Sequence, residues 1–178
     1  NSNSKSFDLH SIADKISANI DFEMLVEYLL SFNNRFGEAI TPTAISKMIS
    51  KIGNSYKPTR VADLCCGIGN ISRFFVLSDV DGYDINAGCI KLANKLLPNV
   101  NFYNQCIIKS EINKTYDMVL AHIPFGMKME IENKKHQFEK LAIEKSISIL
   151  EDGGKLLCVV PQFFLINHSS FINRSFLN

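Results

Sequence analysis

Apolar side chains recur at helical spacing through the first third of the chain. Two runs carry apolar residues three or four positions apart, and Asp21 between them is a plausible helix cap. This spacing predicts two helices, which we assign to a helical N-terminal extension covering residues 1–35. The apolar positions of the two runs are Phe7, Leu9, Ile12, Ile16 and Ile20, then Phe22, Leu25, Leu29 and Phe32.

A third helix is expected to start at Thr41. A hydroxyl at the N-cap followed by Pro42 at the first helical position is a strong start signal, because proline lacks only an N–H that would be unpaired there. On its own this pattern indicates only a well-started amphipathic helix. Its apolar face would consist of Ile45, Met48, Ile49 and Ile52.

Short apolar runs alternate with helical patterns from residue 61 onward. Asn86 can cap a helix that Pro98 stops, and a later helix is expected to end at Asp152-Gly153-Gly154. This alternation predicts an α/β fold, doubly wound, with a mainly parallel sheet and helices on both faces, over residues 36–178. The expected strands are residues 61–64, 80–84, 100–103, 117–121 and a buried run at 155–161.

Composition limits the kind of protein. With 178 residues, 46% hydrophobic side chains and no long apolar run, the chain is sized for one soluble domain that does not span a membrane. The polar start, Asn1 to Ser6, lacks the apolar region of a secretory signal. Five cysteines with no C-x-x-C pair favour reduced thiols in a cytoplasm and no zinc site. A net charge of +1 means that nucleic acid would have to meet a local patch or another subunit.

Two glycines one residue apart follow the first apolar strand and carry the strongest chemical signal. Gly67 and Gly69 come just after Asp63, and without Cβ atoms they let a ligand approach bare backbone. Asp84 lies at the end of the next strand, about where a ribose-binding acid is expected, roughly 20 residues beyond the glycines. Ser72 stands where a dinucleotide motif needs glycine or alanine, so NAD is a poor match. The plain alternative is a turn that only joins a strand to a helix.

The acid, the Gly-x-Gly turn and the second acid together resemble motifs I and II of the class I S-adenosylmethionine-dependent methyltransferases. The resemblance implies a Rossmann-like fold and S-adenosylmethionine as the cofactor. It also implies that Asp63 orders the loop and the methionine end, and that Asp84 holds the adenosine ribose. Cys66, Gly67, Gly69 and Ile85 complete the expected cofactor-binding set around them.

A second segment, Gly37-Glu38-x-x-Thr41-Pro42, resembles motif X of the amino-methyltransferases of bacterial restriction-modification systems, particularly the modification subunits of type I systems. In that family the segment folds over the methionine part of the cofactor. A helix N-terminus also offers free N–H donors to a carboxylate. Thr41 and Pro42 are therefore expected in the cofactor site.

The catalytic motif of that family is altered here. Amino-methyltransferases carry (Asn/Asp/Ser)-Pro-Pro-(Tyr/Phe) after the fourth strand, and this chain has His122-Ile123-Pro124-Phe125. The resemblance implies that His122 and the Ile123 carbonyl hold the target amine while Phe125 stacks on an extruded base. Cys106 stands where relatives commonly have an acid that recognises the base. His122, Pro124 and Phe125 are the expected catalytic residues.

Three explanations of His122 stay open: an altered acceptor in a working enzyme, a polar residue in a site that binds cofactor without turnover, or a deliberate catalytic substitution. The expected function is methyl transfer to the exocyclic amine of adenine in DNA, in a restriction-modification context. The alternatives are a catalytically inactive cofactor-binding or assembly module, and a methyltransferase acting on an RNA or protein amine.

The usual fold ends in a hairpin of two further strands, and little chain remains after Val160. We therefore expect those C-terminal strands to be missing and the domain to be truncated. An unpaired sheet edge and a phenylalanine-rich tail, with Phe163, Phe164, Phe171 and Phe176, favour a fragment, a homodimer or a subunit of a larger assembly. Nothing resembles a target-recognition domain, so DNA is expected as a partner only with a further subunit, such as a specificity subunit.

Overall fold

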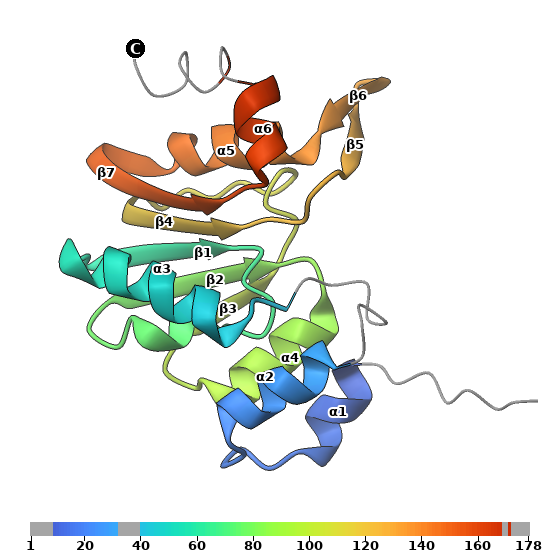
Figure 1. Ribbon diagram of the computed structural model, residues 1–178, viewed down its shortest axis with the longest axis vertical. Helices are drawn as coiled ribbons and strands as arrows, with labels where there is room; N and C mark the ends of the chain where they lie inside the picture. The colour runs from blue at the N-terminus through green and yellow to red at the C-terminus, as the bar shows by residue number, and fades with distance from the viewer. Residues whose placement is uncertain (1–8, 32–39, 169–170, 172–178) are drawn as a thin grey trace, which may run out of the picture.

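A parallel sheet forms the centre of the molecule, shown by a computed structural model that describes residues 9–31, 40–168 and 171 (Figure 1). Five strands lie in the order β3-β2-β1-β4-β7, and all four pairings are parallel. The order reverses between β1 and β4, which in open α/β sheets is where ligands bind. The strands are β1 (Arg60–Leu64), β2 (Asp79–Asp84), β3 (Asn101–Asn104), β4 (Tyr116–His122) and β7 (Leu150–Val159). The expected α/β fold is confirmed.

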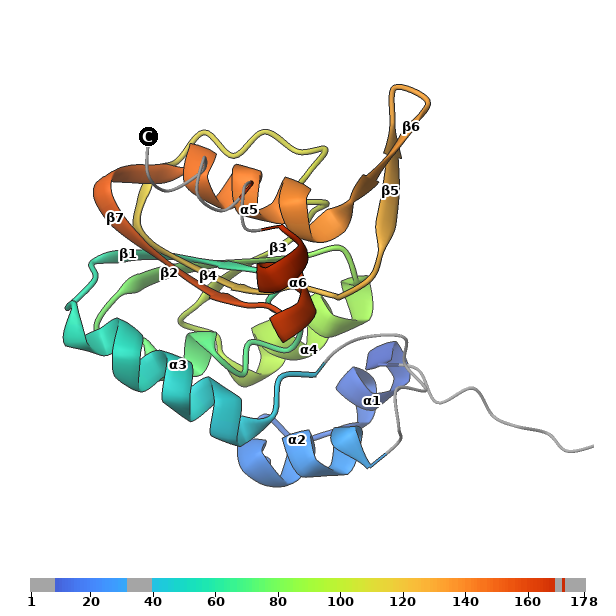
Figure 2. The same cartoon turned by 45° about the horizontal axis from the view of Figure 1, so that its top comes forward.

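Helices cover both faces of this sheet, as Figure 2 shows from a tilted view. Side chains alternate along a strand, so Leu64 of β1 packs on the face under α5 (Phe138–Ser148). Val61 points to the other face, against α3 (Thr43–Ser55) and the short 3₁₀ turn η1 (Ser72–Phe74). The remaining helices are α4 (Ala87–Leu96), on the same side as α3, and α6 (Gln162–Asn167), which follows β7.

The N-terminal helices are attached to the domain by a hydrophobic cluster. α1 (Leu9–Lys15) and α2 (Phe22–Leu30) bury Ile12, Leu25 and Val26 in one cluster with Leu92 of α4 and Ile68 of the glycine loop. Asp21 caps α2, since its side chain accepts a hydrogen bond from the Met24 N–H at 2.9 Å. Both expected helices are present beside the glycine loop, but the first ends at Lys15, before the expected positions Ile16 and Ile20. Phe7 and Phe32 lie outside the described residues.

The expected start of the third helix, with Thr41 at the N-cap, is wrong by one residue. α3 begins at Thr43, with Pro42 at the N-cap and no side-chain capping bond. Small residues form much of its buried face, and a Cβ at Gly53 would lie 2.7 Å from the Phe75 ring. The expected apolar face is only half correct: Ile49 is buried and Ile45 packs against the same cluster, whereas Met48 is 53% exposed and Ile52 is 45% exposed.

The chain between β4 and β7 differs from the expectation in two places. A hairpin of β5 (Lys128–Ile131) and β6 (Lys134–Gln137) follows the β4 loop, and it was not predicted. α5 ends at Ser148 instead of Gly154, and the expected helix end lies inside β7, where the pairing with β4 is irregular. β7 is half-buried, not fully buried, because among the described residues no strand pairs with its outer edge.

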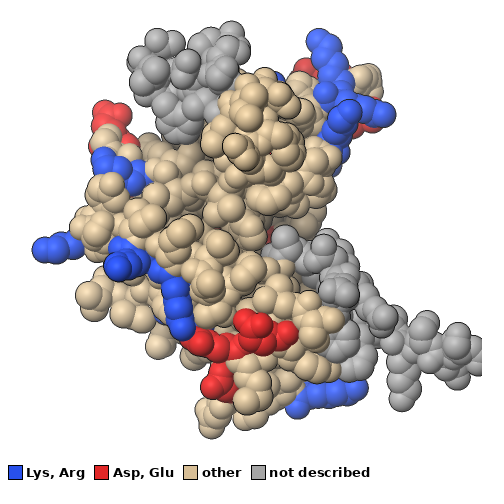
Figure 3. All heavy atoms as spheres, in the orientation of Figure 1, with Lys and Arg blue, Asp and Glu red and all other residues tan. Residues whose placement is uncertain are grey.

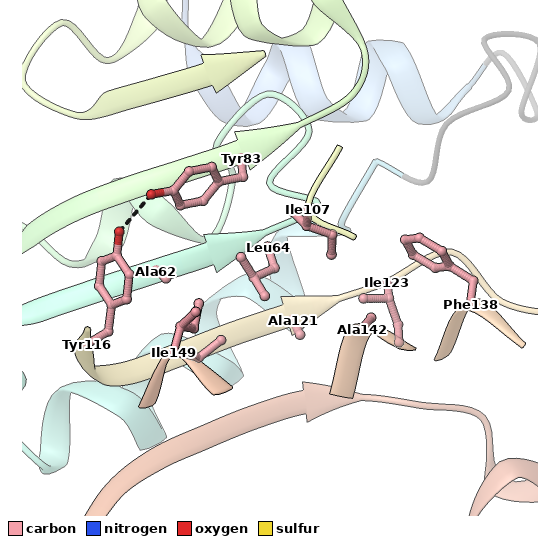
Figure 4. Close-up of a cluster of buried hydrophobic side chains, with 11 residues drawn as sticks. Ala62, Leu64, Tyr83, Ile107, Tyr116, Ala121, Ile123, Phe138, Ala142 and Ile149 are labelled. Atoms are coloured by element: carbon pink, nitrogen blue, oxygen red, sulfur yellow. Dashed lines mark hydrogen bonds between the residues drawn. The ribbon is translucent and has the colours of Figure 1, made fainter. Parts of the chain in front are cut away.

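The face beneath α5 holds the main hydrophobic cluster (Figure 4). A polar group closes it at one end: the Tyr116 hydroxyl lies 2.7 Å from that of Tyr83 and donates to Asp81 at 2.8 Å. Lys114 pairs with the same Asp81 carboxylate at 2.7 Å. The connection from β3 to β4 contains no helix. The Tyr83, Tyr116, Asp81 and Lys114 side chains therefore cover the part of the sheet face that a crossover helix usually covers. None of the described helices is both long and apolar enough to cross a bilayer.

Candidate active site

A cavity of about 450 Å³ opens at the carboxyl ends of β1, β2 and β4, the edge that the strand order predicts for a ligand. Its wall consists of the loops after β1, β2, β3 and β4, together with the base of the β5–β6 hairpin and the start of α5. The wall is mostly apolar with a few polar groups, and cavities of roughly 300–1,000 Å³ with this character commonly bind small molecules.

The glycine loop shapes one side of the cavity. Gly67 lies in the wall at φ 55°, and a Cβ there would meet no described atom within 4 Å, so it would project into open space. Gly69 is needed for a different reason, because a Cβ there would lie 2.7 Å from the Phe102 ring at φ 81°. Cys66 is buried behind the loop, with its N–H donating to the Tyr83 carbonyl at 3.0 Å. Of these three predicted residues, only Gly67 lines the cavity.

Asp84 is fixed at the end of β2 by the glycine loop. One carboxylate oxygen accepts the Gly67 N–H and the other accepts the Asn86 N–H, both at 2.8 Å. Burial raises the pKa of Asp84, and these backbone donors oppose that effect. Ile85 follows it in the wall with 72% of its side chain exposed. An acid beside a bare apolar side chain can bind a ligand with hydroxyls next to a flat apolar group.

Asp63 supports the loop from beneath. It is 1% exposed and is not part of the cavity wall. Ser72 donates a hydrogen bond of 2.6 Å to its Oδ2, whereas Oδ1 has no partner in the described part of the chain. Burial is the main reason that its pKa rises to about 7. Ser72, which departs from the dinucleotide motif, is therefore the partner of the buried acid.

Thr41 and His122 meet across 81 positions of sequence. The Thr41 hydroxyl and the His122 Nδ1 are 2.8 Å apart, and Asn70 of the glycine loop donates to the Thr41 carbonyl at 2.6 Å. The expectation that the Thr41 hydroxyl caps α3 is thus wrong, because that hydroxyl bonds to His122 instead. Pro42 caps the helix but does not line the cavity.

The end of β4 forms the opposite wall. His122 and Pro124 line the cavity, and burial lowers the pKa of His122, which favours the neutral imidazole. Ile123 is fully buried. Phe125 lies outside the wall, 42% exposed, with its ring edge-on to that of His122 at 5.9 Å between centroids.

The loop after His122 is held by a residue that the sequence did not identify. Glu139 of α5 is 3% exposed, and its Oε1 accepts the Gly126 N–H at 2.6 Å. A second bond runs from the Phe138 N–H to the Met127 carbonyl at 3.0 Å. Lys128, at the start of the hairpin, also lines the cavity. The only sequence signal for the β5–β6 hairpin was the alternation of side chains on either side of a two-residue turn.

Comparison with known proteins identifies the family. Residues 33–178 match the family described as Methyltransferase small domain. The chain belongs to this family. A curated relative, "Putative methyltransferase 235L" of Invertebrate iridescent virus 6, is 30% identical over 118 residues, covering 64% of this chain and 41% of the relative. The chain therefore spans less than half the length of that viral protein.

Solved structures show the same fold. A "putative RNA methyltransferase" from Pyrococcus horikoshii aligns with a TM-score of 0.62 at 15% identity, over 94% of this chain and 78% of that chain. The amino pentose methyltransferase CalS10 of Micromonospora echinaspora, solved with S-adenosylmethionine bound, aligns with a TM-score of 0.55 at 18% identity, over 79% and 57%. The expected class I methyltransferase fold is confirmed, and these findings support the expected cofactor of the methyltransferase domain. The resemblance to type I modification subunits stays a prediction.

Proposed function

We propose that this methyltransferase domain binds S-adenosylmethionine and transfers its methyl group to the exocyclic amine of adenine in DNA, in a restriction-modification context. The observation that carries the proposal is one cavity bordered by Gly67, Asp84, His122 and Pro124. In this cavity Gly67 and Asp84, which resemble a cofactor site, lie opposite the end of β4. Amino-methyltransferases hold their target amine at the end of that strand. The five cysteines are free thiols, which suits a reducing cytoplasm.

The residues present fit the cofactor. Asp84 accepts the Gly67 and Asn86 N–H groups, one at each oxygen, and the Ile85 N–H also favours its charged form. A carboxylate has about four acceptor positions, so capacity remains for a ribose hydroxyl. Ile85 offers an exposed apolar surface for adenine, and Gly67 leaves space that a side chain would fill. The N-terminus of α3, held next to His122 by Thr41, can attract the methionine carboxylate.

The chemistry requires an amine lone pair to be aimed at a methyl group. S-adenosylmethionine, when bound, supplies that methyl group on a sulfonium. His122 has two tautomers, and only the one whose Nδ1–H donates to the Thr41 hydroxyl leaves Nε2 able to accept from the amine. Thr41 can therefore decide whether His122 orients the substrate. Phe125, exposed beside the site, is available to stack on an extruded base.

A nucleophilic mechanism on cytosine C5 is disfavoured. Such a mechanism needs a reactive thiolate, and burial raises the pKa of both Cys65 and Cys66 well above that of a free thiol. Direct transfer to an amine needs no covalent intermediate. The free cysteines of the loop are therefore assigned to packing.

Two other functions have a specific observation in their favour. A cofactor-binding module without turnover is supported by Ile123 in place of a proline and by the other tautomer of His122, in which Nδ1 accepts from Thr41 and Nε2 carries the proton. RNA as the substrate is supported by the Pyrococcus horikoshii protein, whose fold matches 94% of the chain. A partner subunit and a homodimer stay predictions.

Calorimetric titration with S-adenosylmethionine tests the cofactor site. Asp84→Asn should weaken binding, because the amide loses acceptor capacity next to the diol. Asp79→Asn is the matched control, since Asp79 is an exposed acid at the other end of the same strand, and it should bind like the parent. Equal affinity in the parent and Asp84→Asn would exclude the assigned ribose site.

Methylation assays test the substrate. The parent and His122→Asn are compared on unmethylated DNA, RNA and protein, with mass spectrometry of the digested product. N6-methyladenine from DNA made by the parent supports the proposal. Activity in His122→Asn alone identifies the parent as the silent module, and methylation of RNA alone moves the assignment to RNA.

A further inference from the structure

The β5–β6 hairpin leaves the body of the domain directly after the loop that carries Phe125. Figures 1 and 2 show it projecting beyond the sheet, next to α5. Its turn, Glu132 and Asn133, has positive φ at both residues (49° and 62°), which suits a tight two-residue hairpin. Met129 packs on the main hydrophobic cluster, but most of the other side chains are exposed. An isolated two-stranded ribbon is at best marginally stable in water, so its projection is not explained by stability.

Lysines gather on this hairpin, as the blue side chains in Figure 3 show. Lys128 lines the cavity, and Lys134 and Lys135 are exposed on β6 near the turn. Within the described residues none of the three forms an ion pair, whereas the lysines and arginines that do are all elsewhere. Glu130 and Glu132 on the same hairpin limit its excess of positive charge.

The register spaces these lysines along the ribbon. Lys135 pairs with Glu130 and Lys134 with Ile131, two and three positions beyond Lys128. At about 3.3 Å per residue, the two are roughly 7 and 10 Å further from the cavity than Lys128. Side chains alternate along a strand and paired residues share a face, so Lys128 and Lys135 lie on one face of the ribbon and Lys134 on the other. Consecutive phosphates of one DNA strand advance about 3.4 Å along the helix axis, so Lys128 and Lys135 are spaced by about two nucleotides.

We infer that the β5–β6 hairpin is the arm that holds the nucleic-acid backbone beside the extruded base. Lys128 binds a phosphate at the mouth of the cavity, and Lys135, on the same face of the ribbon, binds a phosphate further along the same DNA strand. This inference rests on the proposed function and adds the surface that recognises the polymer. A chain with a net charge of only +1 needs such a local patch, and a two-stranded ribbon is narrow enough to enter a major groove.

The salt dependence of DNA binding tests the arm. Fluorescence anisotropy measures the affinity for an oligonucleotide with an unpaired adenine, in the presence of S-adenosylhomocysteine, between about 50 and 200 mM salt. Each lost phosphate contact should reduce the slope of log K against log salt by about 0.9, so Lys135→Gln should lower it by about 0.9. Lys134→Gln, on the opposite face of the ribbon, should keep a slope near that of the parent. Over that fourfold range of salt, the parent should then lose about three- to fourfold more affinity than Lys135→Gln.

Control variants separate the arm from charge in general. Lys51→Gln/Lys57→Gln removes two exposed lysines from the end of α3 and the turn after it, away from the cavity, and should keep the slope of the parent. Glu130→Gln/Glu132→Gln removes the opposing charge and should tighten binding. All variants should bind S-adenosylmethionine as the parent does, which shows that they are folded.

The outcomes are distinguishable. If the parent methylates DNA but Lys135→Gln keeps its affinity and slope, the arm is wrong and the proposed function stands. If the parent binds the cofactor but neither binds nor methylates a polynucleotide, both the arm and the nucleic-acid function are wrong.

Discussion

Replacing Asp63 by asparagine should stabilise the domain at neutral and alkaline pH but not in acid. The carboxyl group is buried, one of its oxygens has no partner in the described structure, and its pKa rises from 3.8 to about 7. Between these two values the unfolded chain loses the proton while the folded chain keeps it. Unfolding therefore becomes easier as the pH rises through this range, and the full cost is present above pH 7.

The magnitude follows from the two pKa values. Each tenfold change in a protonation constant is worth about 1.4 kcal/mol, so the ionised Asp63 costs on the order of 4 kcal/mol above pH 7. Asp63→Asn carries no charge at any pH and can still bond to the Ser72 hydroxyl. The variant should thus match the parent near pH 4 and exceed its stability by up to about 4 kcal/mol near pH 8.

Urea unfolding followed by circular dichroism, at several values between about pH 4 and pH 8, measures this difference, because the chain has no tryptophan to follow. Ser72→Ala is a useful counterpart. It removes the hydrogen bond that lowers the pKa of Asp63. The ionised Asp63 should then lower the free energy of unfolding at alkaline pH even further. A stability difference between Asp63→Asn and the parent that stays constant over the whole range would refute the reasoning.

Three further changes have expected outcomes. Gly69→Ala should destabilise the domain by about 1–3 kcal/mol in thermal melts, because its Cβ would lie 2.7 Å from the Phe102 ring at positive φ; an unchanged melt would contradict this. Tyr116→Phe removes a buried hydroxyl with two partners and should cost about 1–3 kcal/mol in the same assay. Thr41→Val should slow methyl transfer roughly fivefold or more, the value of one hydrogen bond, while Thr41→Ser keeps the bond to His122 and the rate; equal rates in the two variants would exclude a role for the hydroxyl.

Much of the fold could be predicted because its signals are local. The apolar runs of β1 and β4 are buried on both faces, and such strands are evident as continuous hydrophobic segments. Asn86 was expected to cap α4 and does so, accepting the N–H groups of Gly88 and Cys89. Each of these features depends on residues within a few positions of one another.

The rest depends on contacts that spacing cannot show. Thr41 looked like a helix cap, but tertiary structure gives its hydroxyl to His122 and leaves the cap to Pro42. No sequence pattern marks Glu139, because its role is to accept the Gly126 N–H, and the two residues meet only when α5 packs against the loop after β4. Gly154 looked like a helix end, but it lies within β7, in the irregular stretch between the Leu150 and Lys155 pairings with β4.

The hydrogen bond between Thr41 and His122 also has a consequence during synthesis. The two partners are 81 positions apart, a distance that takes roughly 4–16 s to translate at about 5–20 residues per second. Until β4 has left the ribosome, a nascent chain has its glycine loop but no second wall against which a ligand could be held. Added cofactor should therefore rescue destabilised variants during synthesis only once β4 has left the ribosome.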